Sequence, residues 1–235
     1  MSKAIGESLV SIVVPTYNER ENVQRLVNGI RAALAGRWPY EIIVVDDNSP
    51  DGTAGAVRQA AKRDPAVKLL LRPKELGLGS AVVAGFRVAR GNQWVMMDAD
   101  LSHRPEDLPG LLEGLTDADI VVGSRYVTGG GVAGWPLHRR AVSRTASAVG
   151  RLLVGLRVKD ATSGFVAYRR EAVEPLLPAL APRGFKLLVE ILAKARSATV
   201  RETPILFVER EQGHSKFNGS EVFAFLSLCL EPRRR

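Results

Sequence analysis

The sequence of 235 residues is poor in cysteine and histidine. Its single cysteine, Cys229, cannot form a disulfide within the chain, which agrees with a reducing compartment. The three histidines, His103, His138 and His214, are too scattered for a zinc signature. The two shortages argue against a disulfide scaffold and against a zinc site built on histidines.

Long hydrophobic runs are also missing. The first seven residues lack the apolar core of a signal peptide, and the late apolar run from Val222 to Leu230 is about half as long as a bilayer span requires. We therefore expect that this chain does not cross a membrane by itself. Because the run leads directly into Glu231-Pro232-Arg233-Arg234-Arg235, we expect an amphipathic tail at about 219–235 that lies on a membrane surface.

Acidic residues are absent from Tyr126 to Lys159, and the whole chain has a formal net charge of +8. Such an excess of positive charge favours an anionic partner: a phosphate group, a nucleic acid or an acidic membrane face. In this stretch apolar residues can line one helical face and arginines another, which is typical of a helix that rests on an anionic membrane or cradles a phosphate. A solvated basic helix packed on the core is the alternative.

Strands and helices alternate through the first hundred residues. Apolar runs predict strands from Val10 to Val14, where Pro15 stops the strand, from Glu41 to Val45, from Val67 to Leu71, and just before Asp98. Helices are predicted after Asn18, a candidate N-cap, with an apolar stripe of Val23, Leu26, Val27, Ile30 and Leu34, around Ala56 to Ala61, and from Ser80 to Ala89. Later we expect strands from Asp119 to Val122 and from Arg201 to Glu209, a turn from Asp160 to Phe165, and a helix from Lys186 to Ala195. This order predicts a single α/β domain over residues 1–235, with a mostly parallel central sheet flanked by helices.

Two carboxylates follow the strand that ends at Met97. Asp98 and Asp100 are two residues apart, so on an extended backbone their side chains point to the same side. Carboxylates this close repel each other unless a cation lies between them, and Mg²⁺ or Mn²⁺ completed by substrate phosphates suits the pair. A solvated turn at the end of a strand is the alternative, because Asp-x-Asp is a short motif.

Other polar residues fall at the same sheet edge, where parallel sheets bind ligands. Glu19 and Asp46 follow the first two strands and can hold a nucleobase or ribose by hydrogen bonds. Arg125, Arg210 and Lys216 can stabilise a diphosphate as it becomes a leaving group. No Gly-Lys-Ser/Thr phosphate loop occurs, and Gly77-Leu78-Gly79 lacks the third glycine of a dinucleotide fingerprint.

Together these segments resemble the inverting family 2 glycosyltransferases with the GT-A fold, and within that family the dolichol-phosphate (polyprenol-phosphate) mannose synthases. The resemblance implies a Rossmann-like nucleotide-diphospho-sugar transferase domain. The matching segments come in the family's order over roughly residues 8 to 220: Val14-Pro15-Thr16-Tyr17-Asn18-Glu19-Arg20-Glu21-Asn22, Val45-Asp46-Asp47-Asn48-Ser49-Pro50-Asp51-Gly52-Thr53, Met97-Asp98-Ala99-Asp100-Leu101-Ser102-His103, Gly123-Ser124-Arg125-Tyr126, Thr162-Ser163-Gly164-Phe165 and Gly213-His214-Ser215-Lys216.

The resemblance also implies a role for each site residue. The nucleotide, expected to be the guanosine diphosphate of GDP-mannose, would contact Pro15, Tyr17, Glu19 and Asp46. Asp98 and Asp100 would hold Mg²⁺ or Mn²⁺, and this chain has Ser102 where some relatives have glutamine. The donor diphosphate or the acceptor phosphate would contact Arg125, Arg210, Ser215 and Lys216, and Arg139 would lie near the acceptor phosphate.

The implied reaction is metal-dependent transfer of mannose, with inversion, to dolichyl or polyprenyl phosphate, with Asp100, Arg125 and Arg210 as catalytic residues. Because the acceptor phosphate is already anionic at neutral pH, with a second pKa of about 6, no general base is needed. Transfer from UDP-glucose or another nucleotide sugar, and a non-catalytic protein that binds nucleic acid or anionic lipid, remain the alternatives. Members of this family often continue into transmembrane helices. We therefore expect this chain to be either a truncated form or one that pairs with a membrane-embedded subunit. We expect it to lie on the cytoplasmic face of the membrane as a peripheral protein and not to bind nucleic acid.

Overall fold

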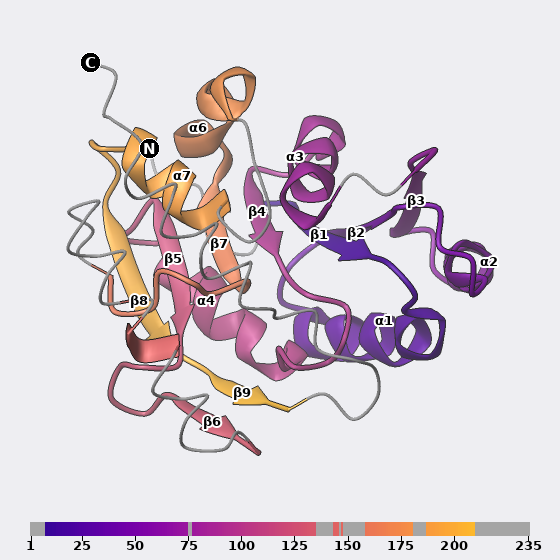
Figure 1. The fold of residues 1–235 in the computed structure, drawn as a ribbon, viewed down its shortest axis with the longest axis horizontal. Helices are drawn as coiled ribbons and strands as arrows, with labels where there is room; N and C mark the ends of the chain where they lie inside the picture. The colour runs from indigo at the N-terminus through magenta and orange to yellow at the C-terminus, as the bar shows by residue number, and fades with distance from the viewer. Residues whose placement is uncertain are drawn as a thin grey trace.

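The computed structural model describes residues 8–74, 77–134, 143–145, 147, 158–180 and 187–209. Over the first hundred residues it shows the predicted alternation of strands and helices (Figure 1). In chain order these elements are β1 (Val10–Thr16), α1 (Arg20–Leu34), β2 (Tyr40–Asp46), α2 (Thr53–Arg63), β3 (Val67–Leu71), α3 (Leu78–Val88) and β4 (Gln93–Met96).

The second half adds shorter elements. They are the 3₁₀ turn η2 (Pro105–Asp107), α4 (Leu108–Gly114), β5 (Ile120–Ser124), β6 (Gly131–Ala133), β7 (Val166–Arg169), α6 (Arg170–Val173), the 3₁₀ turn η3 (Glu174–Ala179), α7 (Leu187–Lys194), β8 (Val200–Pro204) and β9 (Leu206–Val208). Sequence periodicity did not predict α4, β6, β7 or α6, because each is too short to show a clear repeat.

Seven strands form one sheet in the order β3-β2-β1-β4-β7-β5-β8. All neighbouring pairs are parallel except those of β7, which runs antiparallel to both β4 and β5. The predicted α/β class with a mostly parallel central sheet is confirmed. Because β1, β2 and β4 run side by side in the same direction, the loops that follow them emerge at the same edge of the sheet.

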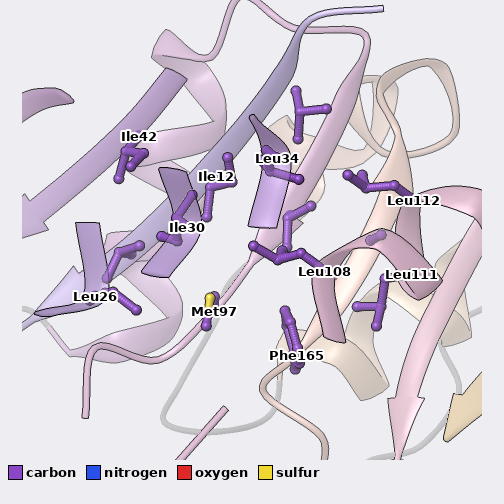
Figure 2. Close-up of a cluster of buried hydrophobic side chains, with 14 of the residues drawn as sticks. Ile12, Leu26, Ile30, Leu34, Ile42, Met97, Leu108, Leu111, Leu112 and Phe165 are labelled. Atoms are coloured by element: carbon purple, nitrogen blue, oxygen red, sulfur yellow. The ribbon is translucent and has the colours of Figure 1, made fainter. Parts of the chain in front are cut away.

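Helices cover both faces of the sheet, α1 and α4 on one and α3 and α7 on the other (Figure 1). The predicted apolar stripe of α1 is buried against Ile12 and Ile42 of the sheet and against Leu108 and Leu111 of α4 (Figure 2). The opposite face packs Phe86 of α3 on Trp94, with ring centroids 4.8 Å apart. Both faces are therefore dry, and the polar loops at the strand ends remain as the place for chemistry.

Three local predictions were wrong. β1 does not stop at Pro15 but continues to Thr16. The last β1 residue that pairs with β4 is Val13, so there is no β4 partner opposite Pro15. Because Pro15 would have no hydrogen bond to make on that side, its missing N–H does not end the strand. Asn18 is not the N-cap of α1; it adopts a positive φ of 60°, and Glu19 occupies the N-cap position without a side-chain hydrogen bond to the helix. The strand predicted from Arg201 to Glu209 is two strands, β8 and β9. The first pairs with β5 and ends at Pro204, which has no N–H to donate to a ladder, and the second pairs with β6.

Within the described ranges, no helix combines the length and the apolar composition that a membrane span requires. The tail predicted at 219–235 lies outside the described residues, and so does most of the acid-free segment from Tyr126 to Lys159. The single-domain organisation and both membrane-facing segments stay predictions.

Candidate active site

The loops after β1 and β2 are joined to each other by hydrogen bonds. The Ser49 hydroxyl donates to Asp46 Oδ1 (2.5 Å) and accepts from the main-chain N–H of Asn18 (3.0 Å). The next residue, Glu19, donates its main-chain N–H to Thr53 Oγ1 at the start of α2 (3.0 Å). The structure therefore brings the first two predicted nucleotide-binding loops side by side, as the parallel topology requires.

Asp46 is fully buried at the base of these loops. Its carboxylate accepts hydrogen bonds from the Thr16 hydroxyl (3.0 Å) and from the N–H of Ser49 (3.0 Å), in addition to the Ser49 hydroxyl. The geometry supports a role in shaping the loops. Tyr17 and Glu19 are half-buried beside it, whereas Pro15 is buried. The predicted contacts of all four residues with a nucleotide stay predictions.

A buried ion pair that could not be predicted from the sequence joins the residue after β2 to the residue after β3. The Arg72 guanidinium contacts the Asp47 carboxylate, and it also donates to Ser80 Oγ (2.8 Å) and to the carbonyl of Gly77 (3.2 Å). Asp47 in turn accepts from the N–H of Gly77 (3.1 Å), which has a φ of 90°. The pair ties the end of β2 to the start of α3.

Asp98 and Asp100 lie in the loop that follows β4. The side chain of Asp98 is 24% exposed, whereas Asp100 is buried and its Oδ1 accepts the N–H of Ser102 (2.9 Å). The Ser102 hydroxyl is buried and has no hydrogen-bond partner among the described residues. Gly164 packs against the same loop, because a Cβ at this position would lie 2.9 Å from Asp98 Oδ2. The site thus combines one accessible carboxylate, one buried carboxylate and one buried hydroxyl in a short loop.

This arrangement fits a divalent cation. Carboxylates and a hydroxyl are oxygen ligands of the kind that Mg²⁺ and Mn²⁺ prefer, and a buried hydroxyl without a partner gains a partner when a cation binds nearby. No group of three or more His, Cys, Asp or Glu side chains is placed to hold a metal in the described ranges. A cation here would therefore need further oxygen ligands, such as those of a substrate diphosphate.

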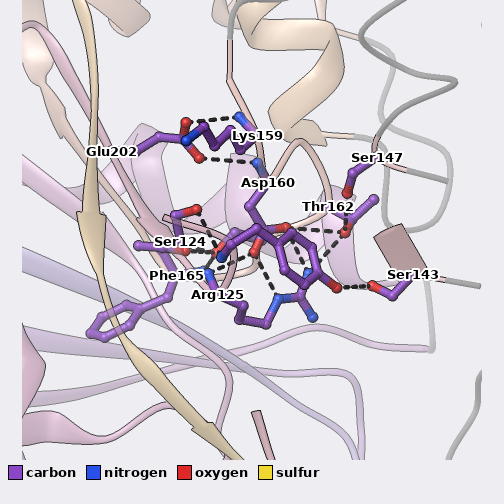
Figure 3. Close-up of polar contacts among 12 residues, drawn as sticks. Ser124, Arg125, Ser143, Ser147, Lys159, Asp160, Thr162, Phe165 and Glu202 are labelled. Carbon is purple, nitrogen blue, oxygen red and sulfur yellow. Dashed lines mark hydrogen bonds and ion pairs between the residues drawn. The ribbon is translucent and has the colours of Figure 1, made fainter. Parts of the chain in front are cut away.

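Arg125 lies at the end of β5 in a second buried ion pair (Figure 3). Its Nε and Nη2 donate to the two oxygens of Asp160, each at 2.7 Å, and Nη2 also donates to Thr162 Oγ1 (2.8 Å). Burial alone would lower the pKa of Arg125, but the Asp160 carboxylate outweighs it and raises that pKa above its ordinary value. Arg125 is therefore cationic under all ordinary conditions, and its contact with a diphosphate stays a prediction.

The same cluster holds part of the acid-free segment. The Tyr126 hydroxyl donates to Ser143 Oγ (2.7 Å), and the hydroxyls of Ser147 and Thr162 are 3.4 Å apart. Glu202 of β8 accepts the N–H groups of Lys159 and Asp160 and so fixes the loop before β7 (Figure 3). Asp160 is the first acid after the acid-free segment, a signal that could have identified it as the counter-ion.

Four predicted site residues, Arg139, Arg210, Ser215 and Lys216, lie outside the described residues. The strand that precedes Arg210 is described, and it reaches the carboxylate loop: Val208 of β9 donates its N–H to the carbonyl of Ser102 (3.1 Å). β9 also pairs with β6, which follows the glycine run after Arg125. The two predicted phosphate-binding segments are thus connected in sequence to a ribbon that contacts the carboxylate loop.

Comparison with known proteins agrees with this geometry. The family model "Glycosyl transferase family 2" matches residues 11–177. A dolichol-phosphate mannosyltransferase of Pyrococcus furiosus is 47% identical over 220 residues, which cover 92% of this chain and 61% of the relative. A polyprenol monophosphomannose synthase of Mycolicibacterium smegmatis is 42% identical over 219 residues, which cover 90% of this chain and 82% of the relative.

A solved structure shows the same fold. The mannosyltransferase PcManGT of Pyrobaculum calidifontis, in complex with GDP-Man and Mn²⁺, superimposes with a TM-score of 0.62 at 21% identity, over 89% of this chain and 59% of that one. The fold and the strand-end loops are those of a GT-A glycosyltransferase domain, so the predicted GT-A fold is confirmed. The chain belongs to glycosyl transferase family 2. The predicted resemblance to polyprenyl-phosphate mannose synthases is confirmed by its relatives, although the chain spans only about three-fifths of the archaeal one.

Proposed function

We propose that this protein transfers mannose from GDP-mannose to a dolichyl or polyprenyl phosphate, with inversion and with Mg²⁺ or Mn²⁺. One observation carries the proposal: Asp98 and Asp100 follow β4 at the sheet edge where the joined loops of Glu19 and Asp46 also lie. A nucleotide held by those loops would extend its diphosphate toward the carboxylates. The names of the relatives support the acceptor class, and the GDP-Man and Mn²⁺ of the structural neighbour support the donor and the metal.

Asp98 and Asp100 are the proposed metal ligands, and we assign the Ser102 hydroxyl, which has no hydrogen-bond partner among the described residues, as a further oxygen ligand. When bound, the metal would neutralise charge that develops on the departing diphosphate. We assign Arg210 and Lys216 to the diphosphate or the acceptor phosphate, with Ser215 and Arg139 on the acceptor. Because the acceptor phosphate is itself an anionic nucleophile, these residues need only bind and orient it.

Arg125 has a distinct place in this proposal. Its guanidinium is fixed by Asp160 and Thr162, and it also lies 5.3 Å from the ring centroid of Tyr126 and 5.4 Å from that of Phe207. Burial would lower the pKa of Arg125, and the charge of Asp160 chiefly, with that of Asp98 to a smaller extent, raises it. We assign Arg125 to stabilising negative charge on the diphosphate from this fixed position.

We place the protein on the cytoplasmic face of a membrane, where its lipid acceptor would be reached, and we propose a membrane-embedded partner subunit. The net charge of +8 supports attraction to an anionic surface. Each lysine or arginine close to an anionic surface contributes about 1 kcal/mol of attraction. A few of the 33 lysines and arginines near the surface would therefore contribute several times that amount.

The test is transfer of radiolabel into organic-extractable lipid phosphate, with GDP-mannose and UDP-glucose supplied separately, each with Mn²⁺ and with chelator. We expect label from GDP-mannose alone, its loss with chelator, and its loss in Asp100→Asn. Glu106→Gln is the matched control, because Glu106 follows the same loop but is 65% exposed. Label from UDP-glucose alone would overturn the mannose assignment, and no label from either donor would favour a non-catalytic binding protein.

A further inference from the structure

His103 closes the carboxylate loop on itself. The imidazole is buried, with only 2% of the residue exposed, and its Nδ1 accepts a hydrogen bond from the main-chain N–H of Asp98 at 3.2 Å. Because a nitrogen that accepts cannot carry the proton, the neutral ring holds its proton on Nε2. The Asp98 carboxylate oxygen Oδ2 is 3.6 Å from Nδ1, too far for a hydrogen bond. The contact that holds Asp98 is therefore to its backbone.

Aromatic rings hold the imidazole on two sides. Phe165 stacks on it with ring centroids 5.1 Å apart and planes inclined by 24°, and Phe207 of β9 meets it edge-on at 5.4 Å. Gly164 leaves no spare room on the Asp98 side, because a Cβ there would lie 3.1 Å from His103 Cε1 and 2.9 Å from Asp98 Oδ2. This packing restricts rotation of the imidazole and so defines the position of its acceptor nitrogen.

The loop between these two residues is strained and needs such an anchor. Leu101 adopts a φ of 62°, which a residue with a Cβ rarely does, and the hydrogen bond between Asp98 and His103 spans it. Asp100 accepts the N–H of Ser102 within the loop, whereas the partly exposed Asp98 has its backbone N–H held by His103. Losing the histidine acceptor would remove the hydrogen bond that holds the main-chain N–H of Asp98.

We infer that His103 is a positioning residue for the metal: by holding the Asp98 N–H, it fixes the direction of the Asp98 carboxylate. This inference rests on the proposed function, which makes Asp98 a metal ligand. Groups that orient a ligand in this way typically contribute 10- to 100-fold to metal affinity. A histidine that merely fills the core would contribute to stability and not to metal affinity.

Two variants separate the acceptor from the ring. His103→Asn keeps an acceptor oxygen about where Nδ1 lies but loses the ring stack, and His103→Phe keeps the stack but has no acceptor. We expect Mn²⁺ affinity, measured on the full chain with GDP from the free-Mn²⁺ EPR signal, to fall about tenfold in His103→Phe. In His103→Asn we expect it to stay within about threefold of wild type, although this variant loses packing against both phenylalanines and melts at a lower temperature.

Controls distinguish failure of this inference from failure of the proposed function. Glu106→Gln should bind Mn²⁺ as wild type does, and Asp100→Asn should not bind it. If wild type itself binds no Mn²⁺, the metal site is wrong and the inference falls with it. If wild type binds Mn²⁺ but His103→Phe binds it equally well, the inference alone is overturned. The inference is also overturned if the loss of Mn²⁺ affinity follows the loss of stability, so that His103→Asn loses it. Should His103→Phe not fold, His103→Asn decides: near-wild-type affinity supports the acceptor role, and lost affinity overturns it.

Discussion

A buried carboxylate on the edge of the sheet opposite the candidate site is expected to dominate the acid sensitivity of this protein. Glu41, at the start of β2, is 1% exposed and accepts four hydrogen bonds. Its Oε1 receives the Ser11 hydroxyl (2.6 Å) and the main-chain N–H of Arg90 (2.7 Å). Its Oε2 receives Lys68 Nζ (2.5 Å) and Arg90 Nε (3.1 Å).

The magnitude follows from the pKa of Glu41. Burial alone would raise this pKa, but the hydrogen bonds from Lys68, Ser11 and Arg90 outweigh burial and lower it from 4.5 to about 2. Such a lowering corresponds to about 3 kcal/mol of stability. Because the folded-state pKa is depressed, this contribution is complete above the unfolded value near 4.5 and is lost as the pH falls through about 2.

Glu41→Gln removes the charge while keeping the shape of the side chain. We expect its free energy of unfolding in urea at pH 7 to be about 3 kcal/mol below that of wild type, and the difference to shrink to about 1 kcal/mol at pH 3. Glu113→Gln is the matched control: its pair with Arg37 is 53% exposed on both sides, so we expect a loss of less than about 1 kcal/mol. A Glu41→Gln difference below about 1 kcal/mol at pH 7, or one that does not shrink on acidification, would refute this reasoning.

Two further predictions concern other buried polar groups. Asp160→Asn should lower the free energy of unfolding by about 3 kcal/mol, because it leaves the buried Arg125 guanidinium without its counter-charge. Urea titration should show a loss of less than about 1 kcal/mol for Asp117→Asn, whose pair with Arg201 is mostly exposed, and equal losses would contradict the prediction. Tyr168→Phe should raise the melting temperature, because the buried Tyr168 hydroxyl has no partner among the described residues and its removal ends a desolvation cost of about 1 kcal/mol. A lower melting temperature on calorimetry would show that the hydroxyl is bonded after all.

The individual residues of the site show where reasoning from sequence stops. Glu19, Asp46, Asp98 and Asp100 could be assigned to one sheet edge, because alternating strands and helices give a parallel sheet whose strand-end loops lie together. Nothing in the local sequence showed that Asp46 is fully buried. Its hydrogen bonds come from Thr16 and Ser49, and only the docking of two loops brings those donors to it.

What the sequence determined by itself was the α/β class, the order of the first seven elements and the family, because periodicity and motif order are properties of the chain alone. Only the tertiary structure decided that β7 inserts antiparallel between β4 and β5, and that Arg125 pairs with Asp160, 35 residues away. It also decided that His103, a histidine without a metal signature, lies between Phe165 and Phe207 and accepts the main-chain N–H of Asp98. The contacts of β7, of Arg125 with Asp160 and of His103 with the two phenylalanines join segments distant in sequence. Their energies depend on burial, which a one-dimensional pattern does not contain.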